Sequence, residues 1–316
     1  MGKFVFKRCM SAIPVLIVVL VLVFFLMRVL PGNPIYSIAE DADLSEEQLA
    51  LLEEKYGLNE SVFQQFGKYI KNIFKGDWGT SYFNGKPVFQ NIFGRMEATL
   101  VITVYSTLIT LLVGIPVGVY AATHHNSKMD YALSSTSMLF TIIPSFCIGI
   151  CFLYIFAFKL KWFPLRGYTT IAKGGFWAAI RSATLPSFAI GLSGMAGFAR
   201  HTRSQMLDVL NSDYIRTARA KGLANNVVHY KHALRGVLSI LITMVSNTIL
   251  NNLGGSAVLE SVFNIQGVGL LGFESISRRD YSQEQAILLF FAILFVFMNI
   301  LLDIIYKLLD PRIELD

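Results

Sequence analysis

Charged residues and cysteines are both scarce in this sequence. Only 15% of its 316 residues are charged and 54% are hydrophobic, whereas soluble domains carry about 25% charged residues. This scarcity excludes an ordinary soluble domain. The three cysteines, Cys9, Cys147 and Cys151, lie in or beside apolar segments, so we expect no disulfide framework. Cys147 and Cys151 are four residues apart, but a metal site needs more ligands, so we interpret them as packing residues.

Motifs for catalysis and for nucleotide binding are also missing. The sequence contains no GxxxxGK(S/T), HExxH or GxSxG pattern, and no carboxylate pair inside an apolar run, as proton-coupled carriers often require. Residues 267–272 read GVGLLG, a formal GxGxxG, but they follow an apolar helix instead of a strand, so we interpret them as a chance match. We therefore predict that the chain is not an enzyme and binds no cofactor or metal.

The charges are clustered, which leaves long uncharged runs. Runs of at least 18 residues occupy 9–27, 98–123, 131–158, 182–199, 236–259 and 285–302. Each can cross a hydrocarbon core, which requires about 17–25 helical residues. The sequence therefore predicts an all-α, polytopic membrane protein with six transmembrane helices and both termini on the same side.

Basic residues predict the orientation of these helices. Lys3, Lys7 and Arg8 precede the first apolar run and place the N-terminus in the cytoplasm. That run continues to Pro31 with no small-residue cleavage site, so we expect a helix that is not removed as a signal peptide. Because the net charge of +6 comes from bases beside apolar runs, it indicates membrane topology and not binding to nucleic acid.

The predicted organisation follows from these runs. We expect a cytoplasmic N-terminus and first membrane helix at 1–30, an extracytoplasmic loop at 31–96, a membrane core at 97–310 with a cytoplasmic loop at 200–236, and a cytoplasmic tail at 311–316. The core helices are predicted at 97–121, 131–157, 184–199, 237–261 and 285–307. Loop 158–183 holds five bases and no acid, against the positive-inside rule, but the helix count places it outside.

The loop at 31–96 is net acidic, with nine acids and six bases, which fits the outer side of the membrane. Ser45 and Gln48 predict a capping box at the start of a helix, with a hydrophobic staple of Leu44 and Leu49, and Gly57 predicts its end. A second, amphipathic helix is indicated by Phe63, Phe66, Ile70 and Ile73.

One polar stretch, Asp213–Gly236, interrupts the apolar core. Its bases are Arg216, Arg219, Lys221, Lys231 and Arg235, against the single acid Asp213. Ser212 or Asp213 can cap a helix that Gly222 ends, and a second short helix is expected from about Asn225 to Leu234. Two interpretations remain open for this cytoplasmic segment: a docking element for another protein, or a basic loop that only orients the chain.

Several membrane segments carry polar or small residues. Asn247 and Asn251 share a helix face and Asn252 is adjacent; amides inside a membrane either bond to neighbouring helices or line a watery path. Pro144 predicts a kink beside such a path. Tight helix packing is expected at Gly114 and Gly118, with Pro116 between them, and at Gly191, Ser193, Gly194 and Gly197, where Ser193 and Gly197 are spaced for contact.

The polar stretch resembles a known motif. Arg216-Thr217-Ala218, three residues and then Gly222 is similar to the EAA---G loop of ATP-binding-cassette (ABC) import permeases. DYIRTARAKGL resembles the variant in dipeptide, oligopeptide and nickel permeases; Arg216 stands where the wider superfamily has Glu, and Thr217 where it has the first Ala. Further segments are similar to motifs of that family and follow in the same order: PGNP, GDWGTS followed by PV, ESVFNIQGVG, RDY and DPR. Within ESVFNIQGVG, Gln266 replaces a proline of the family motif.

The resemblance implies a type I ABC importer permease fold and a non-catalytic subunit of the bacterial cytoplasmic membrane. The implied partners are a second homologous permease, two ABC ATPase subunits that carry ATP and Mg, an extracytoplasmic substrate-binding protein, a peptide substrate and membrane lipid, but no nucleic acid. The 31–96 loop either contacts the binding protein or caps the pore. The alternatives are a nickel or metal-chelate permease of the same family, or a passive channel or secondary carrier.

Residues for two sites are predicted. The coupling helix that docks on an ATPase comprises Asp213, Tyr214, Arg216, Thr217, Ala218, Arg219, Ala220, Lys221 and Gly222. In this prediction the side chains that dock on the ATPase are Arg216, Arg219 and Lys221. The close contact and the turn are set by Ala218 and Gly222. The pore-lining candidates are Asn247, Asn251, Asn252 and Pro144.

Overall fold

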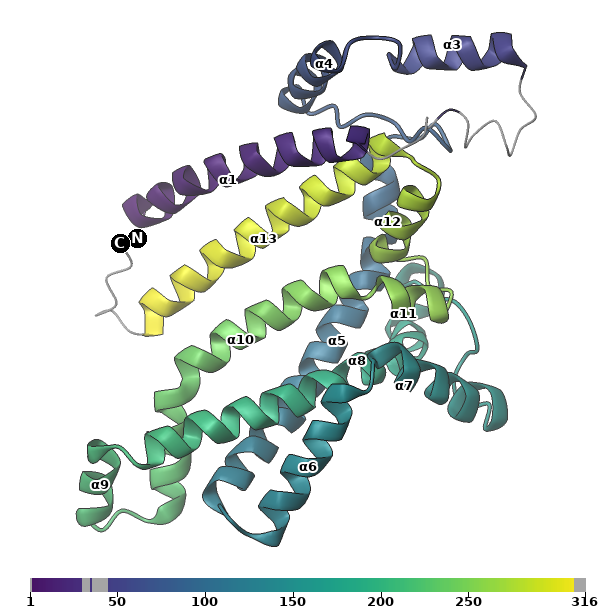
Figure 1. The fold of residues 1–316 in the computed structure, drawn as a ribbon. Helices are drawn as coiled ribbons and strands as arrows, with labels where there is room; N and C mark the ends of the chain where they lie inside the picture. Colours follow the sequence, from purple (N-terminus) through teal and green to yellow (C-terminus); the bar gives the residue numbers. More distant parts are fainter. Residues whose placement is uncertain (1, 30–34, 36–44, 310–316) are drawn as a thin grey trace. The chain divides into compact units, whose positions relative to one another are not determined.

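The computed structural model describes residues 2–29, 35 and 45–309, and these are helical apart from turns and one isolated β-bridge between Thr80 and Pro87 (Figure 1). The chain forms two compact units. Unit 1 comprises Met1–Glu97 with Gly267–Ile300, and unit 2 comprises Ala98–Gln266 with Leu301–Asp316.

Unit 1 contains α1 (Gly2–Val29), α3 (Glu46–Tyr56), α4 (Val62–Phe74), α12 (Val268–Ser277), the start of α5 (Val88–Thr123) and most of α13 (Tyr281–Leu309). Phe24 of α1 is fully buried, with its ring centroid 5.0 Å from that of Phe66 and 5.4 Å from that of Tyr69 on α4. The amphipathic α4 therefore packs its apolar face on α1. A second core joins α5, α12 and α13 through Val88, Ile92, Val268, Leu271 and Ile287.

The predicted helix in the acidic segment is confirmed. Ser45 and Gln48 form the capping box of α3, and Gly57 ends the helix at φ +66°. Leu44, the first member of the predicted staple, lies outside the described residues. The second predicted helix corresponds to α4, which begins with a further capping box of Ser61 and Gln64.

Unit 2 contains the rest of α5 together with α6 (Lys128–Ile142), α7 (Ser145–Phe152), the π-helix η1 (Leu153–Lys159), α8 (Ile171–Leu210), α9 (Asp213–Ala220), the π-helix η2 (Val227–Ala233), α10 (Leu234–Gly255) and α11 (Ala257–Val262). α8 contacts α6, α7 and α10, so it is the central helix of this unit. One buried cluster joins α7, α8 and α11 through Ile148, Ala189 and Leu259.

Four helices of the described chain are long and apolar enough to cross a membrane: Phe6–Val29, Val88–Thr123, Val227–Gly254 and Tyr281–Lys307. They contain or overlap the first, second, fifth and sixth predicted spans. The third predicted span, 131–157, is broken at Pro144, where Lys128–Ile142 and Ser145–Lys159 meet at 93°. The expected kink is thus a sharp bend, because the proline begins a new helix and interrupts the backbone hydrogen bonds.

The fourth predicted span, 184–199, lies within the longer helix α8, which begins at Ile171 and contains one non-helical residue, Gly175 at φ 76°. The predicted outer loop 158–183 is therefore helical over its second half. The short helix expected from about Asn225 to Leu234 is helical over this range, but it is not separate, because η2 continues directly into α10 without a break. The predicted fifth span is also divided, since α10 ends at Gly255 and α11 follows.

Small residues bring α5 and α8 together in unit 2. A Cβ atom added to Gly118 would lie 2.5 Å from the Ala199 carbonyl oxygen, and one added to Gly114 would lie 2.8 Å from the Phe198 Cβ. On α8, the close contacts are made by Gly191 and Gly194, which face Ile109 and Thr110. The tight helix contact expected at Gly197 is not made within this chain, since an added Cβ there would meet nothing within 4 Å.

Candidate functional site

The predicted docking segment forms α9, a short helix anchored on one side. Ile215 is fully buried and Ala218 is 7% exposed. Both belong to a buried cluster to which α5 contributes Val119, α8 contributes Met206, and α10 contributes Val237. α9 is therefore packed on three long helices of the same unit.

The end of α9 explains the glycine of the motif. Gly222 has φ +75°, a left-handed conformation that disfavours every residue with a Cβ atom. The Gly222 N–H donates to the Arg219 carbonyl oxygen at 2.9 Å, and the Leu223 N–H donates to that of Ala218 at 3.4 Å. This is the Schellman arrangement, which satisfies the last carbonyl groups of the helix.

The start of α9 differs from the prediction in one respect. Ser212 is the N-cap residue, but its side chain makes no capping bond and donates instead to the Val209 carbonyl oxygen at 2.6 Å. Asp213 lies in the first turn, where its negative charge is favourable to the helix dipole.

The opposite face of α9 is exposed and basic. Tyr214 is 49% exposed. Arg216, Thr217, Arg219, Ala220, Lys221 and Gly222 are exposed as well. The ion pair between Arg216 and Asp213, 3.4 Å long, lies in solvent and contributes little to stability. Ala218 belongs to the other face, where it packs within this chain.

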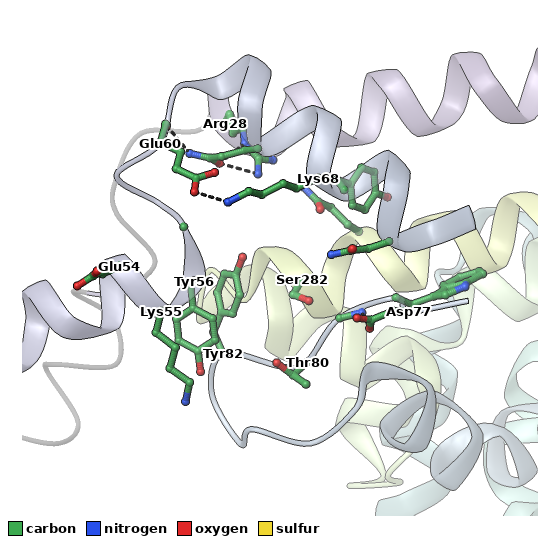
Figure 2. Close-up of a pocket in the computed structure, with 17 residues that line it drawn as sticks. Arg28, Glu54, Lys55, Tyr56, Glu60, Lys68, Asp77, Thr80, Tyr82 and Ser282 are labelled. Carbon is green, nitrogen blue, oxygen red and sulfur yellow. Dashed lines mark hydrogen bonds and ion pairs between the residues drawn. The ribbon is translucent and has the colours of Figure 1, made fainter. Parts of the chain in front are cut away.

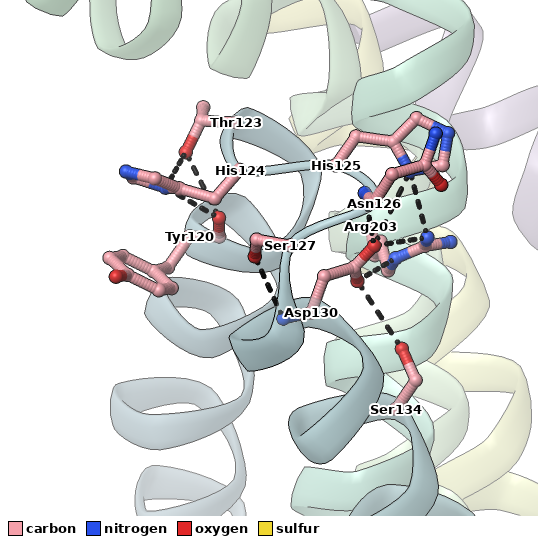
Figure 3. Close-up of polar contacts among 9 residues, drawn as sticks. All are labelled: Tyr120, Thr123, His124, His125, Asn126, Ser127, Asp130, Ser134 and Arg203. Carbon is pink, nitrogen blue, oxygen red and sulfur yellow. Dashed lines mark hydrogen bonds and ion pairs between the residues drawn. The ribbon is translucent and has the colours of Figure 1, made fainter.

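A polar cluster that the sequence did not reveal joins α6 to α8 (Figure 3). The Asp130 carboxylate is 2% exposed and accepts two hydrogen bonds from Arg203, from Nε to Oδ1 at 2.5 Å and from Nη2 to Oδ2 at 2.7 Å. It also accepts from the Asn126 N–H at 3.1 Å and from the Ser134 hydroxyl at 3.4 Å. The hydrogen bond to Asp130 raises the pKa of the Arg203 guanidinium. We call this pair the α6–α8 clamp.

His125 belongs to the same cluster. Its Nδ1 lies 3.3 Å from Asp130 Oδ2 and 3.1 Å from Arg203 Nη2. His125 lies in the turn between α5 and α6, and its side chain is 47% exposed. The opposite charges of Asp130 and Arg203 were visible, but the 73 residues that separate them gave no signal of contact.

The pore candidates separate into two groups. The Asn252 side-chain amide donates to the Ser106 hydroxyl at 3.1 Å and to the Thr107 hydroxyl at 3.4 Å, both on α5. Asn252 therefore bonds to a neighbouring helix, the first of the two alternatives. Asn247 and Asn251 are exposed on the surface of this chain, and Pro144 is exposed at the bend between α6 and α7.

The structure brings two sequence motifs of unit 1 together. Ser81, the last residue of GDWGTS, donates its hydroxyl hydrogen to the Asp280 carboxylate of the RDY motif. The Tyr82 N–H donates to the same carboxylate at 3.1 Å, and the Gln283 N–H does so at 3.2 Å. Ser81 is 2% exposed and Asp280 4% exposed. The two motifs thus form one buried set of hydrogen bonds between the 76–82 loop and the start of α13.

Two family models match the chain. Residues 114–315 match the family described as "Binding-protein-dependent transport system inner membrane component", and residues 1–103 match the N-terminal family of such membrane components.

Similar proteins extend over the full length. The oligopeptide transport system permease protein AppB of Bacillus subtilis is 38% identical, covering 99% of this chain and 100% of that protein. The dipeptide transport system permease protein DppB of Alkalihalophilus pseudofirmus is 36% identical, again over 99% of this chain and 100% of that protein.

The fold is similar to that of a solved transporter. A chain of the inward-facing MetNI methionine ABC transporter matches with a TM-score of 0.58 at 19% identity, covering 71% of this chain and 98% of that chain. At this identity the likeness shows the fold alone, which is that of a type I ABC importer permease. The chain belongs to the family of inner-membrane components of binding-protein-dependent transport systems, the ABC importer permeases, and is a multi-pass protein of the cell membrane.

Proposed function

We propose that this chain is the permease subunit of an ATP-driven peptide importer and forms half of its translocation pathway. The relatives that match at full length are named as permeases of oligopeptide and dipeptide transport systems, and peptide is therefore the proposed cargo. The observation that carries the mechanism is the two-sided α9, with a buried apolar face and an exposed basic face.

The proposed partners follow from the permease role. Two ABC ATPase subunits supply ATP hydrolysis, a second homologous permease completes the pathway, and an extracytoplasmic binding protein delivers the peptide. This chain itself is non-catalytic. The exposed face of α9 contacts one ATPase through Tyr214, Arg216, Thr217, Arg219 and Lys221.

Coupling requires that motion at α9 reaches the membrane helices. Ile215 and Ala218 lie in a cluster shared with α5, α8 and α10, so displacing α9 displaces the packed ends of these helices. The α6–α8 clamp adds a bidentate charged contact on α8, seven residues before that helix ends at Leu210. Because packed interfaces move as bodies, ATP-driven motion of α9 produces the alternating-access change.

The proposed topology has both termini in the cytoplasm and six spans. The bent pair of α6 with α7 and η1 is one span, and α8 crosses the membrane over its small-residue segment, 184–199. The segment 31–96 is extracytoplasmic and contacts the binding protein, whereas 200–236 and 311–316 are cytoplasmic. In this arrangement Asn247 and Asn251 line the pathway from the exposed face of α10. Pro144, which is exposed at the bend between α6 and α7, is also proposed to border the pathway.

Co-purification of the tagged subunit tests this proposal. Arg219→Glu reverses a charge on the exposed face of α9 and leaves the buried anchors Ile215 and Ala218 unchanged. We expect the ATPases to co-purify with the wild-type chain and to be lost from this variant. Lys75→Glu, an equally exposed site in unit 1, is the matched control and retains them.

Transport completes the test. Vesicles that contain the whole complex are expected to accumulate labelled peptide only with ATP and the binding protein. Accumulation without ATP would make the chain a passive carrier, and accumulation of a nickel chelate instead of peptide would reassign the cargo.

A further inference from the structure

One side of α4 carries apolar side chains that stay exposed. Phe63 is 80% exposed and Phe74 is 85% exposed, and Ile70 between them is partly exposed. Residues 63, 70 and 74 recur at the spacing of whole helical turns, so their side chains lie on one face of the helix. We call these three residues the α4 stripe. A contiguous exposed apolar surface of this kind marks a contact with another molecule or with a membrane.

The opposite side of α4 is polar. It borders a cavity of about 330 Å³ that lies between α4, α3, the 77–82 loop and the start of α13 (Figure 2). The polar residues that α4 contributes to the lining of this cavity are Gln65, Lys68 and Asn72. Figure 2 shows Lys68 on this side of the helix, paired with Glu60. Helical spacing places these residues about half a turn away from the α4 stripe, which therefore points away from the cavity.

Contacts with α1 determine where α4 lies relative to the membrane. α1 is long and apolar enough to cross a membrane, and α4 packs near its end. The rings of Phe66 and Tyr69 both contact the ring of Phe24, which is fully buried. Gln65 Oε1 accepts hydrogen bonds from Arg28 Nε at 3.0 Å and from Arg28 Nη2 at 2.9 Å. α4 thus covers one side of the last turns of a membrane-spanning helix.

The hydrocarbon core of the membrane reaches the level at which α4 packs. Leu22 is 62% exposed and Leu26 is 56% exposed, and both lie on the side of α1 that faces away from Phe24. Apolar side chains that are exposed on a membrane-spanning helix face the acyl chains. Because these two residues precede and follow Phe24, acyl chains extend to its level. α4 therefore lies at the boundary between acyl chains and headgroups.

Lysines lie beside the α4 stripe. Lys71 follows Ile70 and Lys75 follows Phe74, and both lysines are exposed. The long stem of a lysine lets its ammonium group reach the headgroups while neighbouring apolar side chains stay among acyl chains. A helix that lies in the plane of a membrane surface combines phenylalanines on one side with lysines on the other. Interfaces with another protein are depleted in lysine, so the composition of α4 favours lipid.

We propose that α4 lies in the plane of the membrane surface, with the α4 stripe inserted among acyl chains and with Lys71 and Lys75 beside lipid phosphate groups. This contact anchors the helix to the membrane and leaves its cavity-lining side turned away from the lipid. The inference goes beyond the proposed function, because it assigns lipid as the occupant of a surface in the segment 31–96 and does not depend on the cargo.

Spin-label accessibility in vesicles tests the proposal. The complex is reconstituted without the binding protein into phosphatidylethanolamine and phosphatidylglycerol, with the three native cysteines replaced by serine. A nitroxide is attached to a single cysteine in Phe63→Cys or in Phe74→Cys. Oxygen concentrates among acyl chains, whereas a nickel chelate stays in water. We expect the ratio of oxygen to nickel accessibility at both positions to match that of Leu26→Cys, which faces lipid on α1.

Asn72→Cys is the matched control on the same helix, because Asn72 is exposed on the cavity side. Its ratio should be several-fold lower than the ratios at positions 63 and 74. Lys71→Glu combined with Lys75→Glu should lower the ratio at position 74, since acidic side chains are repelled by lipid phosphates. An unchanged ratio in that variant would overturn the lysine contacts.

The remaining outcomes overturn the lipid contact. A ratio at positions 63 and 74 as low as that of Asn72→Cys would place the α4 stripe in water. Protection from both reagents in the complex alone would assign the α4 stripe to the second permease, and protection that appears only after the binding protein is added would assign it to that partner. ATP-driven peptide uptake by the wild-type complex tests the proposed function separately in every case.

Discussion

Breaking the α6–α8 clamp is predicted to destabilise the subunit measurably. Arg203→Ala removes both hydrogen bonds, at 2.5 and 2.7 Å, from an Asp130 side chain that is 2% exposed. Removing one partner of a buried ion pair costs about 3–5 kcal/mol. Arg203 itself is 26% exposed, and Asp130 keeps its bonds from Asn126 and Ser134, so we expect a smaller loss, about 2–3 kcal/mol.

The assay is a double-mutant cycle on the purified complex in detergent, with unfolding followed by circular dichroism. Arg203→Ala and Asp130→Asn together should cost less than the sum of the single changes, with a coupling energy of at least about 1 kcal/mol. Arg203→Lys keeps the charge but loses the bidentate geometry, so it should lie between wild type and Arg203→Ala. Arg200→Ala, exposed on the same helix, is the matched control and changes stability by under about 0.5 kcal/mol. Additive effects of the two single changes would refute the clamp.

Five further substitutions test the structure of unit 2. Gly118→Val should destabilise by about 1–3 kcal/mol in the same unfolding assay, because its side chain meets the α8 backbone, whereas Gly197→Ala should have little effect; equal losses would contradict the close approach. Asn252→Leu should cost about 1–2 kcal/mol through two lost interhelical bonds, while Asn251→Leu should leave stability unchanged and lower peptide uptake; the reverse pattern would exchange their roles. Gly222→Ala should cost about 1–2 kcal/mol at its φ of +75° and weaken ATPase capture, and normal stability would show that this turn tolerates a Cβ.

Local features of the fold were predictable because neighbouring residues determine them. Ser45 and Gln48 cap α3, and Gly57 and Gly222 end helices in left-handed conformations, since each device involves residues only a few positions apart. Long uncharged runs likewise predict membrane helices from composition. The predicted ends of these helices were less accurate, since η2 joins α10 and α8 extends beyond its apolar part. Helices continue past the hydrophobic segment where tertiary packing supports them.

Contacts between distant residues were not predictable. Nothing in a single sequence distinguishes the contacting glycines of α8, Gly191 and Gly194, from Gly197, since the face that meets α5 depends on how the helices pack. The same holds for Asp130 with Arg203 and for Ser81 with Asp280.

For the predicted docking segment, the motif indicated the helix α9 but not which of its faces is buried. The spacing of Ile215 and Ala218, three residues apart, was a signal of a buried face that the motif resemblance concealed. Docking is therefore proposed through the other face of α9.

Photo-crosslinking from α9 tests the central claim most directly. A benzoylphenylalanine placed at Thr217, on the exposed face, should form an adduct with the ATPase subunit, and its yield should change between nucleotide-free and ATP-bound complexes. The same group at Lys75 in unit 1 should give no ATPase adduct. An absent adduct from Thr217 in a complex that still transports peptide would contradict α9 as the element that couples ATP hydrolysis to the pathway.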